Sequence, residues 1–277
     1  MTPADFPRVV AETHDVVIGD TEVIKRFRSW EREEPDREWR GLELLDAYAP
    51  GLAPRPLARW TDGGRPVIMM SRLSGVALGS QPLSEDQLAA VAAALNTLHT
   101  AVPFDEVARL PRRLWDPAAA VDQTREKLKA TPRGHGLVVN RSLDAGLDWI
   151  KSADALPFAR ADVPTVFGQA DGNIGNFIWH KGRCGLVDFE DCGASDRAFE
   201  IADLIEHVST SLTGVLQADD LLRHLALDEA LDRRVRKARR LMALYWLIAL
   251  LPGNQGHDRN PVGSTERQAR RVLTLLA

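Results

Sequence analysis

The stretch FGQADGNIGNFIWHKGRCGLVDFED, residues 167–191, decides how the rest of the chain is interpreted. Its apolar runs FIWH and CGLVDF lie on either side of residues 181–183 (KGR) and predict two antiparallel strands joined by a tight turn. Carboxylate and amide side chains gather around this hairpin, at Asp171, Asn173, Asn176, Asp188 and Glu190. Such groups repel one another or require water, so a purely structural hairpin would not need them. A cation and a negatively charged substrate would explain them, and a wet polar loop is the alternative.

The symmetry of the hairpin predicts which polar groups meet. Asn176 and Asp188 are equally distant from Gly182 in the sequence, so a turn centred on this glycine would place them side by side at the open end. Asp171 precedes them, in the loop that leads into this end. Carboxylate and amide oxygens suit a hard cation such as Mg²⁺, which normally shares its ligands with phosphate oxygens. Asp and Asn are also common in turns, so the spacing alone leaves both interpretations open.

Composition places the chain among ordinary globular proteins. Its 277 residues are 44% hydrophobic and 27% charged, which suits two modest domains or two lobes that share one cleft. The net charge of −4 gives no global basic footprint for nucleic acid. The two cysteines, Cys184 and Cys192, form no disulfide framework and favour a reducing cytoplasm. The apolar run LMALYWLIALLPG is too short for a membrane span. From this run we expect no membrane partner, and from the net charge we expect no nucleic-acid partner. The sequence leaves the oligomeric state open.

The first part of the chain, residues 1–70, has the pattern of a small sheet with one helix. Residues 16–27 predict a hairpin, residues 37–48 a helix and residues 65–75 a further strand. On the helix, Glu38, Leu42 and Leu45 fall on one face, so the carboxylate shares the side that points to the core.

From Ser84 onward the pattern is helical. SEDQ is a capping box, and a stripe of apolar residues follows it at helical spacing. Further helices are predicted at residues 116–131, 141–152, 196–213, 217–230, 231–251 and 264–276. The sequence therefore predicts an α+β fold with a small antiparallel-sheet lobe at 1–70, a connector at 71–83 and a larger, mainly helical lobe at 84–277 that contains the hairpin.

The segments QADGNIGN and LVDFED resemble the catalytic centre of the aminoglycoside phosphotransferase family, which is related to choline kinases and more distantly to protein kinases. The family pattern is roughly H-G-D-x-x-x-x-N, followed by a strand pair that ends in (I/V)-D-(W/F). Three other segments resemble helices of the family: GASDRAFEIADLIEHV, ALNTLHTAVP and REWRGLELLDAYAPGLAPRPL. The resemblance covers about residues 22–277 and implies a two-lobed, protein-kinase-like fold.

This resemblance implies roles for particular residues. Asp171 would be the catalytic base, Asn176 and Asp188 would bind Mg²⁺, and ATP or GTP would donate the phosphate to a hydroxylated small molecule. Lys25 would hold the phosphates, and Glu38 would hold Lys25, with Glu43 as a weaker rival. The backbone of the connector would bind the nucleotide base through Met70, Ser71 and Leu73.

Three features depart from the family pattern. Gln169 and Ala170 stand where the family has His-Gly, and residues 196–198 are DRA where the family has D-P-A. No glycine-rich loop precedes Lys25. A pseudokinase that binds nucleotide or ligand without transfer is therefore a second hypothesis. Because a binding-only protein has little need of the base, the presence of Asp171 with both metal ligands favours active transfer.

An acidic run suggests the class of acceptor. Between Asp188 and Glu206 the chain has seven acidic residues and one arginine. We expect five of them to face the acceptor: Glu190, Asp191, Glu200, Asp203 and Glu206. That charge favours an acceptor with amines, such as an aminoglycoside antibiotic, and hence a function in antibiotic resistance. Solvated helix positions are the alternative for these acids, and choline-like alcohols or sugars are alternative acceptors. Three tryptophans could wall the acceptor pocket or pack in the core: Trp115, Trp149 and Trp246.

Overall fold

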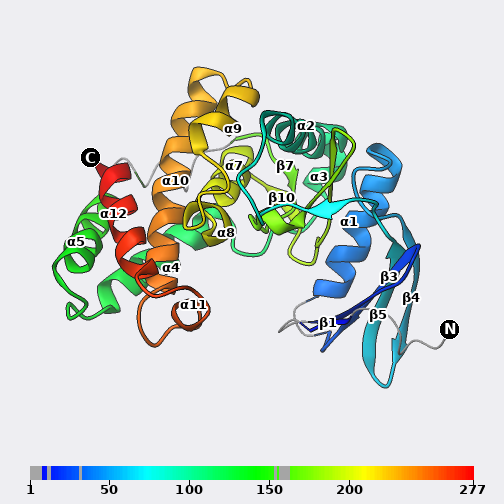
Figure 1. Cartoon of the computed structure of the whole chain (residues 1–277), viewed down its shortest axis with the longest axis horizontal. Helices are drawn as coiled ribbons and strands as arrows, with labels where there is room; N and C mark the ends of the chain where they lie inside the picture. The colour runs from blue at the N-terminus through cyan, green and yellow to red at the C-terminus, as the bar shows by residue number, and fades with distance from the viewer. Residues whose placement is uncertain (1–7, 11–13, 31–32, 153–154, 156–162) are drawn as a thin grey trace.

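A five-stranded antiparallel sheet and one helix form the N-terminal lobe of the computed structural model (Figure 1). The structure describes residues 8–10, 14–30, 33–152, 155 and 163–277. The strands lie in the order β1-β2-β3-β5-β4, and their bounds are β1 (Arg8–Val10), β2 (His14–Ile18), β3 (Glu22–Phe27), β4 (Pro56–Asp62) and β5 (Arg65–Ser71). The predicted hairpin at 16–27 is β2–β3. Lys25, near the middle of β3, is in register with Val16 on one side and Ile68 on the other.

Helix α1 (Glu34–Tyr48) contacts strands β4 and β5 of this sheet. It begins three residues earlier than the sequence predicts, because Pro35 occupies its first turn, where a missing N–H costs nothing. Leu42, Leu45 and Glu38 are all buried, as the helical stripe predicts. The buried Glu38 carboxylate therefore lies on the same side of α1 as Leu42 and Leu45.

Two small sheets lie in the C-terminal lobe. One has the order β6-β8-β9, and the other pairs β7 with β10. Their bounds are β6 (Val76–Ala77), β7 (Val166–Gly168), β8 (Phe177–His180), β9 (Arg183–Leu186) and β10 (Gly193–Ser195), with a short 3₁₀ turn η2 (Ile174–Asn176) before β8. Because β6 belongs to the predicted connector, the connector is tied by strand pairing to the hairpin it leads toward.

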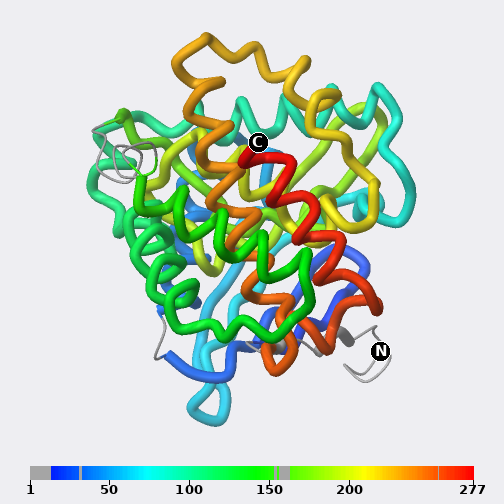
Figure 2. The backbone as a smooth tube through the Cα atoms, turned by 90° about the vertical axis from the view of Figure 1, so that its left-hand side faces the viewer, coloured from blue at the N-terminus to red at the C-terminus, as the bar shows by residue number. Residues whose placement is uncertain are grey.

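Helices form the remainder of the C-terminal lobe. They are α2 (Glu85–Ala101), α3 (Phe104–Ala108), α4 (Pro117–Ala130), α5 (Leu137–Lys151), α7 (Arg197–Glu206), α8 (Val208–Ser211), α9 (Ala218–His224), α10 (Glu229–Ala249), α11 (Gln255–Asp258) and α12 (Ser264–Leu276). The predicted capping box at the start of α2 is confirmed, with Ser84 and Gln87 bonded reciprocally. Helix α12 packs between α5 and α10 at the far end of the lobe (Figure 2). This arrangement confirms the predicted α+β fold with a small sheet lobe and a larger helical lobe.

Two hydrophobic clusters fill the interior. The first runs from Phe27, Leu42 and Ile68 in the sheet lobe to Phe177 and Leu186 in the hairpin, and so crosses between the lobes. The second lies among α4, α5, α7, α10 and α12. Among the helices that the structure describes, none has the length and apolar content needed to cross a lipid bilayer.

Several elements differ from their predicted bounds. The helix predicted at 196–213 is interrupted at His207, where an extended backbone ends α7 and begins α8. The His207 ring accepts the N–H of Ser209, which satisfies a free donor of the second helix. Helix α5 begins four residues before the predicted position, and α9 is shorter than predicted. The strand predicted at 65–75 is β5, but its hairpin partner β4 was missed, although Gly63-Gly64 before β5 is a typical turn.

Candidate active site

The register of the β8–β9 hairpin corrects one prediction. Phe177 pairs with Leu186 and His180 with Arg183, so the turn consists of two residues, Lys181 and Gly182. Both have positive φ angles, 46° and 82°, as a two-residue hairpin turn requires. Continued by one residue, this register aligns Asn176 with Val187. The Val187 N–H donates to the Asn176 carbonyl oxygen over 3.0 Å. The predicted pairing of Asn176 with Asp188 was wrong by one residue, because the turn is centred between two residues and not on Gly182.

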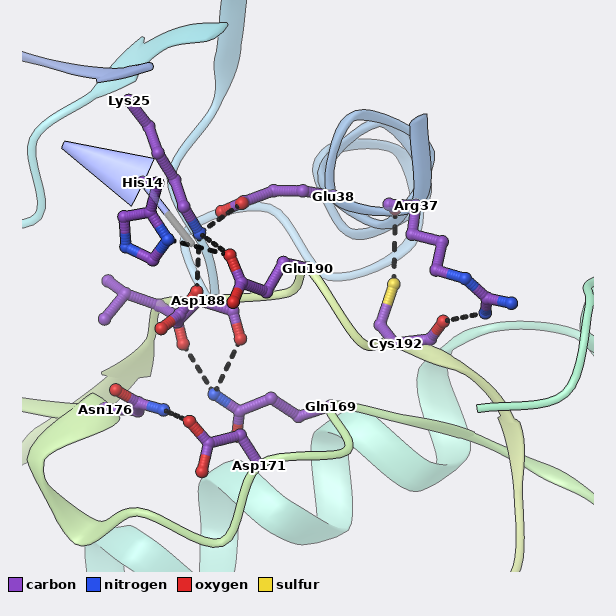
Figure 3. Close-up of polar contacts among 11 residues, drawn as sticks. His14, Lys25, Arg37, Glu38, Gln169, Asp171, Asn176, Asp188, Glu190 and Cys192 are labelled. Carbon is purple, nitrogen blue, oxygen red and sulfur yellow. Dashed lines mark hydrogen bonds and ion pairs between the residues drawn. The ribbon is translucent and has the colours of Figure 1, made fainter. Parts of the chain in front are cut away.

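Asp188 lies one residue beyond that pair, in a left-handed backbone conformation with φ of 69°. Gln169 supports this backbone: its Nε2 donates to the carbonyl oxygens of Val187 at 2.5 Å and Asp188 at 3.4 Å (Figure 3). Only 3% of the Gln169 surface is exposed, so these bonds are shielded from water. The amide thus holds the backbone on which the Asp188 side chain is mounted.

Asp171 and Asn176 contact each other directly. The Asp171 carboxylate accepts hydrogen bonds from the Asn173 N–H at 3.0 Å and from Asn176 Nδ2 at 2.8 Å. Since the amide nitrogen of Asn176 faces Asp171, its Oδ1 is the atom left to bind a cation. Burial raises the pKa of the Asp171 carboxyl above its ordinary value, and the nearby His207 only partly offsets this effect.

The loop of Asp171 lies against helix α7. A Cβ atom on Gly172 would come within 2.3 Å of the Asp203 carbonyl oxygen, so glycine is required for this close approach. The Ile174 N–H donates to Ser209 Oγ over 3.1 Å, which ties the same loop to α8. The loop is therefore held at both its start and its middle by the helices behind it.

Lys25 joins the sheet lobe to this loop region. Its Nζ lies 2.6 Å from Glu38 Oε2, 2.6 Å from Asp188 Oδ1 and 2.9 Å from Glu190 Oε2 (Figure 3). Burial alone would lower the pKa of Lys25, but the three carboxylates raise it well above its ordinary value, so the ammonium stays charged. Glu43, the rival partner, instead accepts a hydrogen bond from Trp39.

His14 is a site residue that the sequence interpretation missed. Its Nδ1 lies 2.9 Å from Glu190 Oε2, and hydrogen bonding to His14 together with the charge of Lys25 lowers the pKa of Glu190 to about 2 despite partial burial. His14 lies two residues before Val16, and Val16 is the register partner of Lys25. Strand alternation would therefore have placed His14 and Lys25 on one face of the sheet. Together with Asp188 and Glu190 it offers ligand atoms that lie within 4.8 Å of one another.

Two of the carboxylates predicted to face the acceptor are instead buried against Arg113. Its Nη1 lies 2.5 Å from Glu200 Oε1, and its Nη2 lies 2.8 Å from Asp203 Oδ2. The same guanidinium donates to the Ala170 carbonyl oxygen, while the Ala170 N–H donates to Glu200. These groups therefore position the residue before Asp171, and the two carboxylates share one buried guanidinium.

Glu206 is fully buried and pairs with two arginines from other helices. Arg239 on α10 lies 2.7 Å from its Oε1, and Arg271 on α12 also contacts the carboxylate. It links three helices and has no exposed surface for an acceptor. Asp191 follows Glu190 in the sequence and is partly exposed.

The connector offers few unused backbone donors. The Ser71 N–H donates to the Arg55 carbonyl, and the Arg72 N–H donates to the Thr21 carbonyl. The Met70 side chain is buried in the first hydrophobic cluster. Three connector residues were predicted to bind the base. Of these, Leu73 lies beyond Ser71 and Arg72, whose N–H groups are already bonded.

The three tryptophans have different surroundings. Trp115 and Trp149 pack against the second hydrophobic cluster, where Trp115 also contacts the rings of Phe199 and Tyr245. Trp246 packs edge-on against the His207 ring, with centroids 4.7 Å apart, and lines a cavity. Of these three tryptophans, Trp246 is the one that contacts His207.

Comparisons with known proteins identify the family and the fold of the chain. The family model described as "Phosphotransferase enzyme family" matches residues 11–260. Among solved structures, a choline/ethanolamine kinase family protein from Mesorhizobium loti is 19% identical with a TM-score of 0.64, over 98% of this chain and 87% of that one. A search of the curated proteins finds no match.

Two similar structures contain ligands. One is a ternary complex of a thermostable mutant of aminoglycoside phosphotransferase APH(4)-Ia with AMP-PNP and hygromycin B, 14% identical with a TM-score of 0.65 over 99% and 95% of the two chains. The other is spectinomycin phosphotransferase APH(9)-Ia with ADP and spectinomycin, 11% identical with a TM-score of 0.62 over 98% and 91%. At these identities the similarity shows a shared fold.

Proposed function

Since the chain belongs to the phosphotransferase enzyme family, we propose that it transfers the γ-phosphate of ATP or GTP to a hydroxyl group of a small molecule. The observation that carries this proposal is the convergence of Lys25, Asp171, Asn176 and Asp188 from both lobes on one place. Phosphoryl transfer requires positioning and charge neutralisation more than covalent catalysis, and these four side chains can supply both.

Lys25 is proposed to bind phosphate oxygens, and Glu38 is proposed to hold its ammonium in place. In the structure Lys25 also contacts Asp188 and Glu190, so an incoming triphosphate would replace one or both of these carboxylates. We propose that the backbone at Leu73 contacts the nucleotide base, because the N–H groups of Ser71 and Arg72 already have partners.

Asn176 and Asp188 are proposed to bind a Mg²⁺ ion through their side-chain oxygen atoms. Asp188 is held on a backbone fixed by Gln169, and the Asn176 amide is oriented by Asp171, so both ligand atoms are preorganised. When bound, the ion would neutralise negative charge on the phosphates. The donor set, one carboxylate and one amide, is typical of sites that leave the remaining positions to phosphate and water.

Asp171 is proposed to orient the acceptor hydroxyl and accept its proton. One of its oxygens is fixed by Asn173 and the other by Asn176, so the carboxylate has a single orientation. The raised pKa of this carboxyl makes it a stronger base than an exposed aspartate, which favours proton acceptance.

The acceptor is proposed to be a hydroxylated small molecule, and the expectation of an aminoglycoside loses part of its basis. That expectation relied on five acidic residues, of which Glu200, Asp203 and Glu206 are paired with arginines.

The free thiols of Cys184 and Cys192 support the proposal of a cytoplasmic location.

The test is Asp171→Asn, with Asp148→Asn on the exposed face of α5 as the matched control. We expect the variant to lower kcat by a factor of about 10² to 10⁴. Nucleotide affinity, measured as a Mg²⁺-dependent thermal shift with ATP and GTP, should stay near the wild-type value. Wild-type turnover in Asp171→Asn would contradict the mechanism, and nucleotide binding without turnover across a broad acceptor panel would favour the pseudokinase hypothesis.

A further inference from the structure

Two nitrogen atoms of the sheet lobe converge on one carboxylate oxygen. His14 Nδ1 and Lys25 Nζ each lie 2.9 Å from Glu190 Oε2 (Figure 3). The two nitrogens belong to the neighbouring strands β2 and β3, whereas Glu190 belongs to the loop after β9 in the other lobe. The Oε2 atom is closed to solvent. A negatively charged oxygen is therefore held between a lysine and a histidine, out of contact with water.

The pairing of β2 with β3 places the two nitrogens together. Phe27 is the register partner of His14, and Val16 is the register partner of Lys25. Paired residues of an antiparallel sheet share a face, as do alternate residues of one strand, so His14, Lys25 and Phe27 lie on the same face.

The Phe27 ring packs beside both side chains. It is fully buried, its centroid lies 4.9 Å from Lys25 Nζ, and it lies 6.0 Å from the centroid of the His14 ring. The positions of the two nitrogens are therefore fixed by packing within the sheet lobe, and not only by the carboxylate that they contact.

The sequence before β2 lacks the usual means of covering phosphates. In protein kinases a glycine-rich loop covers the phosphates of the nucleotide. The first glycine of this chain is Gly19, after the end of β2, and residues 1–18 contain none. A side-chain donor at the start of β2 would supply the missing contact. His14 is the first residue of β2, and its ring nitrogen already lies against an anionic oxygen.

We propose that His14 binds the phosphate chain of the nucleotide together with Lys25, and that a phosphate oxygen takes the position that Glu190 Oε2 occupies in this structure. This inference rests on the proposed function, because it takes a nucleoside triphosphate as the ligand of Lys25. Carboxylate and phosphate oxygens are both anionic acceptors of charge-assisted hydrogen bonds, at the same range of distances. Because Glu190 belongs to a loop and not to the sheet, it moves aside while the two nitrogens stay in place.

The experiment measures binding to the purified full-length chain by isothermal titration. The probes are AMP-PNP and GMP-PNP with Mg²⁺, inorganic tripolyphosphate, and the nucleosides adenosine and guanosine. His14→Leu removes the ring nitrogen and keeps an apolar side chain against Phe27. We expect it to raise Kd for the imido nucleotide that the wild type binds, and for tripolyphosphate, by about tenfold, with no change for the nucleosides.

Two further variants serve as controls for the loss of the histidine. His14→Asn retains a side-chain N–H donor and should recover part of the affinity for the phosphate-containing probes. His180→Leu replaces an exposed histidine of β8 and should bind every probe as the wild type does.

A double variant separates phosphate binding from mere support of Glu190. In a Glu190→Gln background, His14→Leu should still weaken tripolyphosphate and nucleotide binding by about tenfold, because the phosphate contact does not depend on the carboxylate. If His14 only held Glu190, the effect of His14→Leu would vanish in this background. The background also removes the buried charge that loses a partner in His14→Leu, so the comparison holds even if that single variant folds poorly. Thermal unfolding without ligand reports the folding of each variant.

The outcomes distinguish this inference from the proposed function. An unchanged Kd for nucleotide and tripolyphosphate in His14→Leu overturns the inference, as does an equal loss for the nucleosides. If the wild type binds nucleotide but transfers phosphate to no acceptor, the proposed function is contradicted, and the His14 variants still decide the inference. A wild type that binds neither nucleotide nor tripolyphosphate overturns both.

Discussion

Lys25 and Glu38 form a buried ion pair in which Nζ lies 2.6 Å from Oε2 and the two side chains are 4% and 1% exposed. Asp188 and Glu190 contact the same ammonium, so one positive charge faces three negative ones. The two partners are therefore not equivalent. Removal of the cation takes the shared partner from Glu38, Asp188 and Glu190, whereas removal of Glu38 leaves the cation with two partners.

Lys25→Met should strongly destabilise the protein. Breaking a buried ion pair from one side costs about 3–5 kcal/mol, and here the remaining carboxylates also repel one another. Urea unfolding measures the change in the free energy of unfolding. Arg26→Met, on the same strand in an exposed ion pair with Asp62, is the control and should cost about 1 kcal/mol or less.

Glu38→Gln should affect activity more than stability. The neutral amide relieves repulsion among the carboxylates, and burial already raises the pKa of Glu38. Lys25, no longer drawn to α1, should hold the phosphates less well, and we expect kcat/KM for the nucleotide to fall by about tenfold or more. Steady-state kinetics measure this loss. Glu43→Gln, on the same helix, is the control and should leave kcat/KM unchanged. Equal losses in both variants would mean that Lys25 does not depend on Glu38.

Gln169→Leu should weaken the dependence of the reaction on Mg²⁺. The change removes the donor to the Val187 and Asp188 carbonyls, so the backbone that carries Asp188 loses its support. Loss of such an outer partner typically costs about tenfold or more in metal affinity. The Mg²⁺ concentration at half-maximal rate measures it. Gln169→His retains a donor and should recover most of the affinity; an unchanged Mg²⁺ dependence in Gln169→Leu would show that the amide is dispensable.

Arg113→Met should destabilise the protein by about 3–5 kcal/mol, because Glu200 and Asp203 would be left buried without a counter-charge. Arg113→Lys should recover only part of the loss, since one ammonium cannot reproduce the fork that reaches Glu200, Asp203 and Ala170. Chemical denaturation measures both. The exposed neighbour provides the control: Arg112→Met should change stability by about 0.5 kcal/mol or less.

His99 should make stability depend on pH. Burial lowers its pKa from 6.5 to about 4, and the charge of Glu200 only partly opposes this effect. Between these values the unfolded chain binds a proton that the folded chain excludes, so stability falls as pH decreases from 6.5 to 4, by about 3 kcal/mol.

Urea unfolding at several pH values tests this dependence. His99→Gln should flatten the slope in that window, while His180→Gln, at an exposed position of β8, should keep the wild-type slope. A slope that persists in His99→Gln would assign the dependence to other groups.

The parts of the fold that follow local patterns could be predicted from the sequence. The capping box at Ser84 is formed as expected, and the stripe that buries Leu42 and Leu45 also buries Glu38. Asp171 and Asn176 are five residues apart on one short loop, so their contact depends on few intervening residues. Such features depend on short-range spacing, which a single sequence records directly.

Long-range partners could not be predicted in this way. Arg113 lies 87 residues from Glu200 and 90 from Asp203, and no spacing rule connects them. The acidic run was therefore interpreted as a surface for amines, although much of it is a set of internal ion pairs. The counter-charges come from the segment between α3 and α4, which carries Arg113, and from α10 and α12, and packing of this kind is decided by the whole fold.

The two-residue turn at Lys181 and Gly182 has a consequence for how such chains diverge. Because the register of β8 and β9 aligns Asn176 with Val187, an inserted or deleted residue within either strand would shift Asp188 relative to Asn176. Substitutions in these strands leave the number of residues in each strand unchanged. Relatives can therefore be expected to exchange residues freely along this hairpin while its strand lengths stay constant, so that length, more than identity, records descent here.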